Sequence, residues 1–376
     1  MEKSYKGKYI GGQIQRMDAF GHVTGNTIYA SDRAMPGMLH AKVLRHNVHA
    51  GYLRSIDTSE AEKIPGVVAI ITEKDIPGLN LFGLKTDEPV INNGLLRRKG
   101  EIIAAVAAVD EATAIYACSK IKYEIEEKDP VFDIDEAVKD GAPQVRPEGN
   151  YHLFDGPPYP PYRRLRYGDD IDEALASADH IIEGYYDTPP QEHAPMETGA
   201  SLAYIDETGT LTIYTNNQGP FEQGAQIAAI MHLTSNQVVM KGGTLGGSFG
   251  GRNAIHTDHI AALLALKSHR PVRFHMTREE EMLHSTIRGP WRFSVTDGVM
   301  NDGRIVARKV IIWHDAGAYS GLAWYAVEKC VLTVAGPYEI PNVYVDGYCI
   351  YTNKIVASSM RGFGINVGQF AIESNM

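Results

Sequence analysis

The sequence predicts a mixed α/β (α+β) fold in two successive regions, and three patterns support this expectation. Residues 38–44 alternate between apolar and polar side chains, as a half-buried strand does. Residues 66–71 form a short, continuous apolar run, which is typical of a strand buried on both faces. A stretch rich in proline and tyrosine at 156–162 favours an extended linker. We therefore expect a first domain over 1–135, a linker over 136–165 and a second domain over 166–376.

The first region reads as two strand–helix–strand units. The short carboxylate of Asp110 is suited to accept from the free N–H groups at the start of a helix, so a helix is expected to begin just after it. Besides the two strands already given, the expected elements are a helix over 58–63, a strand over 102–109, a helix over 112–119 and a strand over 121–125.

The second region opens with a charged helix over 170–178 and continues with strands that have helices between them. The clearest strands are at 211–214, 238–240, 272–274 and 305–313, and the clearest helices at 223–232 and 255–268.

Composition limits the partners and the compartment. The 376 residues include 36 Lys+Arg and 46 Asp+Glu, a net charge of -10, which disfavours binding to nucleic acid or to an anionic membrane. No apolar run approaches the roughly 20 residues that a membrane span needs, and the first residues lack the apolar core of a secretory signal. The three cysteines, Cys118, Cys330 and Cys349, are too few and too scattered for a disulfide framework or an iron–sulfur cluster, so we expect a reducing cytoplasm.

The strongest local feature is a loop over 241–252 that contains six glycines between a predicted strand and a predicted helix. Glycine lets backbone N–H groups turn toward one point, and a helix from about Asn253 would add the positive end of its dipole. The loop therefore suits a phosphate or an oxyanion, although it matches neither a Walker A loop nor a dinucleotide fingerprint. A purely structural turn is the alternative, and the large ring of Phe249 argues against it.

The segment 191–197 contains two carboxylates and a histidine, which invite a metal site. Its spacing fits no common ligand set and Pro195 interrupts any helix, so polar contacts within a turn are favoured. His256 and His259 could share a metal, but neutral histidines on a helix surface are the simpler interpretation. Nucleophilic serine chemistry is not assigned to Ser248.

Two further segments join groups that could contact a ligand. Gln218 follows a predicted strand, where its amide can both donate and accept a hydrogen bond. The segment 358–364 places the cation of Arg361 beside the ring of Phe363 on a flexible loop. Each segment alone is more typical of turn structure, and their order along the chain is what points to a site.

In this order, the segments resemble the molybdenum hydroxylases of the xanthine dehydrogenase/aldehyde oxidase family. The resemblance rests on Gln-Glu-His followed by a glutamate at 191–197, the Gln218 turn, Gly-Gly-Ser-Phe-Gly-Gly at 246–251 and Arg-Gly-Phe-Gly at 361–364. The stretch 271–282 matches as well. The resemblance implies a hammerhead-type α/β domain near 20–130, followed by the first part of the molybdopterin-binding region.

The resemblance also implies roles for individual residues. Gln218 would hydrogen-bond an oxo ligand of the molybdenum, and Gly247, Phe249 and Gly250 would lie on the loop that touches the metal site through its backbone. Arg361 would contact the cofactor, and Phe363 would stack on a flat substrate. The protein itself would supply no metal ligand, because the pterin holds the molybdenum. The implied reaction is hydroxylation with water as the oxygen source.

Two positions depart from the family's purine-oxidising pattern. Asn253 stands where xanthine oxidisers carry a glutamate, and Lys329 where they carry an arginine, so the bidentate fork is lost while a charge remains. A nicotinate-like N-heteroaromatic substrate is therefore preferred. Lys329 would face its carboxylate or point to solvent. Oxidation of a purine such as xanthine, or of an aldehyde, and a non-catalytic role in molybdopterin binding or assembly remain as alternatives.

The resemblance further implies partners. The family's molybdenum subunit normally continues for several hundred residues, whereas this chain stops within a helix expected from about Asn366, whose apolar face includes Val367, Phe370 and Ala371. A second molybdopterin-subunit chain would supply the catalytic glutamate, and electrons would leave through iron–sulfur and FAD subunits. As in the nicotinate dehydrogenase type, selenium or sulfur would be a terminal ligand of the metal, and the pterin would take a cytosine dinucleotide form.

Overall fold

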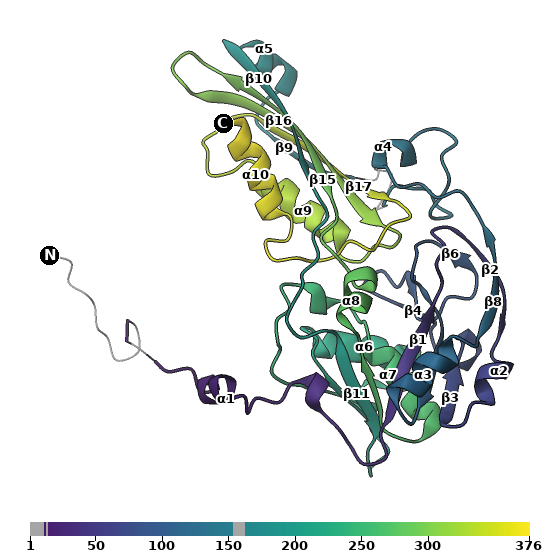
Figure 1. Ribbon diagram of the computed structural model, residues 1–376. Helices are drawn as coiled ribbons and strands as arrows, with labels where there is room; N and C mark the ends of the chain where they lie inside the picture. The colour runs from purple at the N-terminus through teal and green to yellow at the C-terminus, as the bar shows by residue number, and fades with distance from the viewer. Residues whose placement is uncertain (1–10, 13, 153–161) are drawn as a thin grey trace.

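A computed structural model describes residues 11–12, 14–152 and 162–376 (Figure 1). All but the last residue of the proline- and tyrosine-rich stretch at 156–162 lies outside the described residues. Two large sheets, each covered by helices, lie one above the other in Figure 1, and the chain passes between them more than once.

The lower unit is built on a seven-stranded sheet in the order β13-β12-β11-β14-β1-β7-β3. Three of its strands precede the expected linker and four follow it, so a single sheet contains strands from both expected domains. Helices α6 (Pro220–Ile230) and α7 (Asp258–Ser268) pack against this sheet, as does α3 (Glu111–Cys118). The strands are β1 (Leu39–Arg45), β3 (Val67–Ile71), β7 (Ile102–Ala108), β11 (Ala200–Ile205), β12 (Leu211–Thr215), β13 (Val238–Gly242) and β14 (Val272–His275).

Strand β7 shows how the two faces of this sheet are filled. Successive side chains of a strand point to opposite faces. Ala105 and Ala107 accordingly join the core beneath α7, while Ala104 and Val106 join the core beneath α3. The strand buried on both faces is therefore β7. Residues 66–71 were also expected to be buried on both faces. That expectation is wrong at the start of the segment, because β3 is an edge strand and Val68 is 40% exposed.

Smaller strands complete the first region. Strand β2 (Gly51–Asp57) pairs with β6 (Leu95–Leu96) and β8 (Lys122–Glu127), and α2 (Ser59–Glu62) lies before β3. The predicted cap of α3 is confirmed, because the Asp110 carboxylate accepts from the Thr113 N–H at 2.7 Å. The sequence offered no prediction for β2 or for the hairpin of β4 (Leu81–Phe82) and β5 (Glu88–Pro89), which forms a wall of the cavity described below.

The upper unit is a five-stranded sheet in the order β10-β15-β16-β17-β9. Helix α9 (Ala323–Thr333) packs against β16 and β17, α10 (Ile365–Asn375) packs against α9, and α5 (Ile171–Ala176) lies at the outer ends of β15 and β16. The expected linker at 136–165 overlaps α4 (Ile134–Ala137) at one end and β9 at the other. The strands are β9 (Tyr162–Tyr167), β10 (His180–Thr188), β15 (Trp291–Val299), β16 (Ile305–Gly317) and β17 (Val343–Tyr351).

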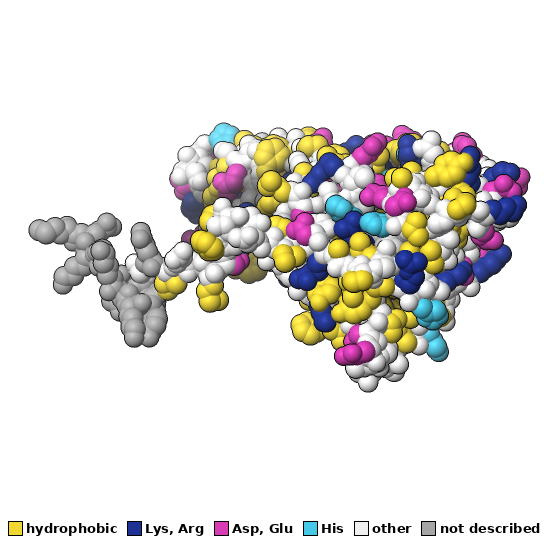
Figure 2. Space-filling view, turned by 60° about the horizontal axis from the view of Figure 1, so that its bottom comes forward, with side chains coloured by type: hydrophobic (Ala, Val, Ile, Leu, Met, Phe, Trp, Pro, Cys, Tyr) yellow, Lys and Arg dark blue, Asp and Glu magenta, His cyan; other side chains and the backbone are white. Residues whose placement is uncertain are grey.

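The N-terminal segment stands away from both units (Figures 1 and 2). Its helix α1 (Ala19–Thr24) contains no buried residue, and Met17, Phe20 and Val23 are all largely exposed. Among the described residues, no helix combines the length and the apolar character that crossing a bilayer requires.

Candidate functional site

A cavity of about 550 Å³ lies where the β4–β5 hairpin meets the loops of the second region. Six residues predicted for the site line it, and they come from three segments that are far apart in the sequence. These residues are Gln218, Phe249, Gly250, Asn253, Arg361 and Phe363.

Two other predicted site residues do not line the cavity. Gly247 packs against Pro195, since a Cβ on this glycine would lie 3.1 Å from the proline Cβ. The Lys329 ammonium lies 4.7 Å from the centre of the Tyr325 ring, so it neither faces the cavity nor simply points to solvent. Tyr325 lines the cavity in its place.

Gln218 presents one free donor group, its side-chain NH2. Its backbone N–H donates to the Arg252 carbonyl at 2.9 Å, which ties the turn to the end of the glycine loop. Its side-chain Oε1 accepts from the Ser248 hydroxyl. The Nε2 group makes no hydrogen bond to any residue that the structure describes, so it is free to donate to a bound group.

The two phenylalanines predicted for the site have left-handed backbone, Phe249 with φ +55° and Phe363 with φ +45°. A bulky residue in this region is strained by about 1–3 kcal/mol, and such strain gathers at functional sites. The Arg361 N–H holds the first of them by donating to the Phe249 carbonyl at 2.8 Å. The ring of Phe363 meets Tyr325 edge to face, with centroids 5.4 Å apart.

Gly250 allows the glycine loop to approach the segment at 358–359. A Cβ at Gly250 would lie 2.6 Å from the Ser359 carbonyl oxygen, and its φ of +106° also favours glycine. The Ser359 hydroxyl donates to the Gly250 carbonyl at 2.9 Å and accepts from the Asn253 amide at 2.8 Å. Asn253 therefore joins two loops while it lines the cavity.

The helix expected from about Asn253 is wrong. The loop ends in a short 3-10 turn, Gly251–Asn253, and α7 begins only at Asp258, so α7 does not start at the glycine loop as expected. The backbone N–H groups of Phe249 and Gly250 have no hydrogen-bond partner among the described residues. An oxyanion at this loop would rely on such amides alone.

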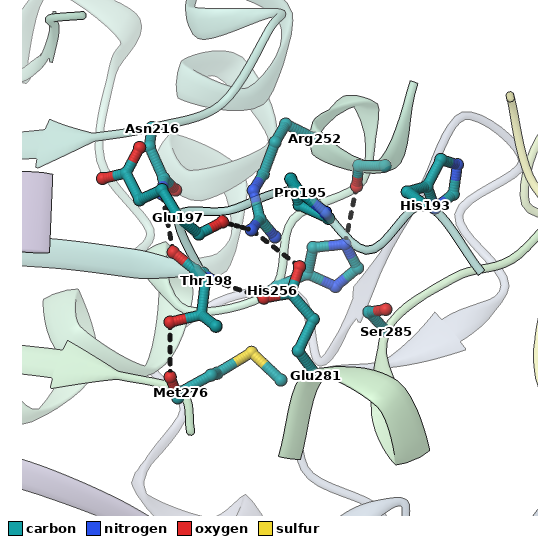
Figure 3. Close-up of polar contacts among 12 residues, drawn as sticks. His193, Pro195, Glu197, Thr198, Asn216, Arg252, His256, Met276, Glu281 and Ser285 are labelled. Atoms are coloured by element: carbon teal, nitrogen blue, oxygen red, sulfur yellow. Dashed lines mark hydrogen bonds and ion pairs between the residues drawn. The ribbon is translucent and has the colours of Figure 1, made fainter. Parts of the chain in front are cut away.

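A buried ion pair supports the loop from behind (Figure 3). Arg252 is 2% exposed, and its Nη2 lies 2.7 Å from the carboxylate of Glu281, the buried residue in the middle of helix α8 (Arg278–His284). The same nitrogen donates to the Glu197 carbonyl at 2.8 Å. The Gly199 N–H donates to Glu281 at 3.1 Å, so both charges are compensated and hydrogen-bonded.

The segment 191–197 also holds the loops together through polar contacts within and around its turn. His193 donates from Nε2 to the Ser359 carbonyl at 2.8 Å, and burial lowers its pKa. The Glu197 carboxylate accepts from the Gly246 N–H at 2.8 Å. Over the described ranges, no cluster of three or more histidine, cysteine or acidic side chains is arranged to hold a metal ion.

His256 and His259 are neutral, as expected, but they are not on a helix surface. His256 precedes α7 and donates from Nε2 to the Gly251 carbonyl at 2.9 Å. His259 is 2% exposed beneath the ring of Phe82. Burial lowers the pKa of each to about 3.

Several cavity residues were missed. Glu222 and Gln226 lie four apart on α6, directly after Gln218, and that spacing on a predicted helix could have indicated one shared face. The hairpin adds two carboxylates, and both are neutralised: Asp87 lies 2.6 Å from Arg146, and Glu88 lies 3.1 Å from Arg98.

Comparison with known proteins agrees with this geometry. Residues 155–376 match the molybdopterin cofactor-binding domain, and residues 24–129 match the a/b hammerhead domain of aldehyde oxidase and xanthine dehydrogenase. The chain belongs to the molybdopterin-binding proteins of the xanthine dehydrogenase/aldehyde oxidase family. The mixed α/β expectation, with a hammerhead domain before a molybdopterin-binding region, is thereby confirmed.

Two curated relatives of this family cover nearly all of the chain. A probable xanthine dehydrogenase subunit of Bacillus subtilis is 35% identical over 362 residues, which are 96% of this chain and 47% of the relative. The nicotinate dehydrogenase large molybdopterin subunit of Eubacterium barkeri is 31% identical over 377 residues, 100% of this chain and 86% of the relative.

Solved family structures have the same fold. An aldehyde oxidoreductase from Desulfovibrio gigas superposes with a TM-score of 0.88 at 27% identity, over 95% of this chain and 40% of the other. Quinoline 2-oxidoreductase from Pseudomonas putida 86 also gives 0.88 at 27% identity, over 98% and 48%. This chain therefore spans less than half the length of these oxidoreductases.

The residues present fit the cofactor that the family binds. An oxygen-rich, anionic pterin needs hydrogen-bond donors and cations, and the cavity offers the free Gln218 Nε2. The exposed guanidinium of Arg361 has no ion-pair partner within the described part of the chain. The unpaired amides of Phe249 and Gly250 add backbone donors. The buried Arg252, whose charge is paired with Glu281, stays outside the cavity and serves to hold the loop.

Proposed function

We propose that the chain is the molybdopterin-holding part of a hydroxylase that oxidises a flat N-heteroaromatic compound, nicotinate-like in kind, with water as the oxygen source. The observation that carries the proposal is the convergence of Gln218, Phe249, Gly250 and Arg361–Phe363 on one cavity. A non-catalytic role, in which the chain only binds or helps to assemble the cofactor, is the alternative.

When bound, the molybdenum–pterin supplies the two-electron oxidising centre. Gln218 would donate from Nε2 to an oxygen at that centre, and Phe249, Gly250 and Arg361 would hold the cofactor through amides and charge. The protein groups are fixed before the substrate arrives, since Ser248 orients the amide and Arg252 anchors the loop. Such fixed dipoles stabilise developing charge without reorganising.

The aromatic wall supports a planar substrate. Phe363 and Tyr325 meet edge to face, and with Phe249 they offer rings against which a flat heterocycle can pack. Because Lys329 lies outside the cavity, a substrate carboxylate would meet Arg361 instead. Asn253 is already bonded to Ser359, so its contact with the substrate would be limited to its exposed face.

We further propose that a further stretch of polypeptide is needed to complete the enzyme. The family relatives and structures above are longer than this chain, which supports a second molybdopterin chain or segment that supplies the catalytic glutamate. Electrons would pass to iron–sulfur and FAD subunits in the cytoplasm. A sulfur or selenium ligand and a cytosine dinucleotide form of the pterin belong to the same proposal.

The test is to purify the intact assembly and measure its content and its substrates. Stoichiometric molybdenum and fluorescent oxidised pterin are expected, together with turnover of nicotinate above xanthine, hypoxanthine and benzaldehyde. Oxygen-18 from labelled water should appear in the product. An assembly that lacks molybdenum and pterin would rule out the proposed enzyme. A preference for benzaldehyde as substrate would rule out the N-heteroaromatic substrate.

A further inference from the structure

The N-terminal arm (residues 14–29) gathers large apolar side chains that this chain leaves uncovered. Five of them are between 59% and 102% exposed, and they are Ile14, Met17, Phe20, Val23 and Ile28. Among the described residues, neither unit packs against them (Figures 1 and 2). Single exposed apolar side chains are ordinary on a protein surface, whereas a group of them indicates a surface that contacts another molecule.

The arm has a structure of its own, held by hydrogen bonds within it. Helix α1 ends at the left-handed Gly25, and the chain then turns back, so that the Thr27 N–H donates to the Gly21 carbonyl at 3.2 Å. The Tyr29 hydroxyl closes this turn by a hydrogen bond to the His22 ring at 3.2 Å. Because its backbone is already ordered, the arm can present its apolar side chains to a partner at a reduced entropy cost.

The root of the arm lies at the end of the seven-stranded sheet that carries the cavity loops. At this root, the Arg33 guanidinium carbon lies 4.1 Å from the centre of the Tyr214 ring, and the Lys241 ammonium lies 5.4 Å from the same ring. Tyr214 is one residue from the end of β12, and Lys241 is one residue from the end of the parallel strand β13. These two strands lead into the Gln218 turn and the glycine loop, so the arm starts beside the segments that line the cavity.

The size of the arm and the length of the relatives indicate what covers it. A stable interface buries roughly 20–30 residues on each side, so five side chains supplement a larger contact and would not hold a second copy of this chain by themselves. The quinoline 2-oxidoreductase described above superposes over 98% of this chain, a share too large to leave out the arm, yet the match is only 48% of that relative. That relative therefore has a counterpart of most of the arm, together with polypeptide beyond the match that is available to cover it.

We propose that the N-terminal arm docks into an apolar groove of the second molybdopterin chain, the polypeptide that corresponds to the unmatched part of the longer relatives. The inference rests on the proposed function in one respect, namely that such a chain completes the cavity. A chain that reaches the cavity loops is also within reach of the arm, because both leave the same end of the sheet. Phe20 and Val23 are three residues apart on α1, so they lie on one side of the helix and would enter the groove together.

The test places a photoreactive group on the arm in the intact assembly that contains this chain. Phe20 is replaced by p-benzoylphenylalanine, the purified assembly is illuminated, and crosslinked peptides are identified by mass spectrometry. A crosslink to the second molybdopterin chain is expected. Crosslinks only to this chain's own units, to a second copy of it or to an iron–sulfur or FAD subunit would overturn the proposal, as would the absence of any crosslink.

Molybdenum and pterin are measured on the same preparation, so that the two proposals can fail separately. An assembly without cofactor whose arm still crosslinks to the second chain would support the docking and remove the proposed function. A cofactor-loaded assembly whose arm does not crosslink to that chain would remove the docking alone. An assembly that contains no second molybdopterin polypeptide would overturn both.

Two double variants measure the contribution of the apolar side chains. Phe20→Ser with Val23→Ser should raise the Kd between this chain and the second chain by roughly tenfold or more, measured by mass photometry on dilution. The Tm of this chain should not change, because both side chains are exposed and outside its core. The matched control is Ile115→Ser with Tyr116→Ser, since both are 53% exposed on α3 and lie outside the cavity. Equal Kd values for the two double variants contradict the proposal.

Discussion

The two sides of the glycine loop differ in whether their cations are paired. Behind the loop, Arg252 and Glu281 are buried, paired at 2.7 Å and hydrogen-bonded to backbone. On the cavity side, the Gln218 Nε2 and the Arg361 guanidinium have no partner in the described part of the chain, and two phenylalanines hold strained backbone. The difference separates groups that hold the fold from groups that are kept free for a ligand.

The largest expected effect concerns the ion pair behind the loop. Glu281→Gln keeps the shape of the side chain but leaves Arg252 as an uncompensated buried charge. We expect a loss of about 3–5 kcal/mol in the free energy of unfolding, measured by urea denaturation. Glu279→Gln is the control, because Glu279 is exposed on the same helix, and it should change stability by less than about 0.5 kcal/mol. Similar losses in both variants would contradict the assigned role.

The next effect is a pH dependence of the same support. The folded-state pKa of His256 is lowered from 6.5 to about 3, so between these values the unfolded chain binds the proton and the folded chain does not. Stability present above pH 6.5 is therefore lost as the pH falls toward 3, by at most about 1.4 kcal/mol per pH unit. His256→Gln should reduce this slope in unfolding curves recorded from pH 7 to 4 by the share of one histidine, because His259 has a pKa lowered in the same way and keeps its own share. His180→Gln, at an exposed position, should leave the slope unchanged.

Sequence patterns anticipated the site best where a residue type is required by backbone geometry or by direct contact. The Gln218 turn, the glycine loop and the Arg361–Phe363 segment were found because an amide, a run of glycines and a cation next to a ring rarely follow one another along a chain in this order. The helix after the loop was misplaced because residues 253–257 carry helical spacing, yet the His256 hydrogen bond to Gly251 favours a turn.

Other parts of the site left no readable pattern. The β4–β5 hairpin has strands of two residues each, which is too short for alternation to appear. Tyr325 lies next to Trp324 on α9, and only the tertiary contact of Tyr325 with Phe363 shows its place in the cavity. A continuous apolar run such as β7 and a capped helix such as α3 were predictable, whereas contacts between distant segments were not.

On the cavity side, Phe363→Ala should impair function far more than folding. Removing the ring takes away the aromatic surface that a flat substrate would bury, worth about 1.5–3 kcal/mol, or roughly 10- to 100-fold in kcat/KM. Phe370→Ala provides the control, because that ring is 49% exposed on α10 and lies outside the cavity. Steady-state kinetics with a heterocycle measure the contrast, and unchanged turnover in Phe363→Ala would show that the ring does not touch substrate.

Gln218→Ala tests the free amide itself. The variant should keep its circular dichroism spectrum, since the turn is held by the backbone N–H of residue 218 and not by its side chain. Pterin and molybdenum content, measured per polypeptide, should fall if the Nε2 donor contacts the cofactor. The comparison variant is Gln226→Ala, which changes the same residue type on the same cavity wall. Equal cofactor content in both variants would remove the assigned role of Gln218.

The smallest effect concerns backbone strain, and its sign is the informative part. Phe249 has φ +55° and its side chain is 48% exposed, so Phe249→Gly should relieve strain and stabilise the fold by up to about 1 kcal/mol while it weakens ligand binding. Phe221→Gly, on the first turn of α6 and 94% exposed, should instead destabilise by roughly 0.5–1 kcal/mol, because glycine is unfavourable in a helix. If the free energy of unfolding rises in Phe249→Gly and falls in Phe221→Gly, the left-handed conformation of Phe249 is retained at a cost in stability, as expected of a residue kept for binding. If both substitutions destabilise equally, the ring contributes packing and the strain argument for this side of the loop fails.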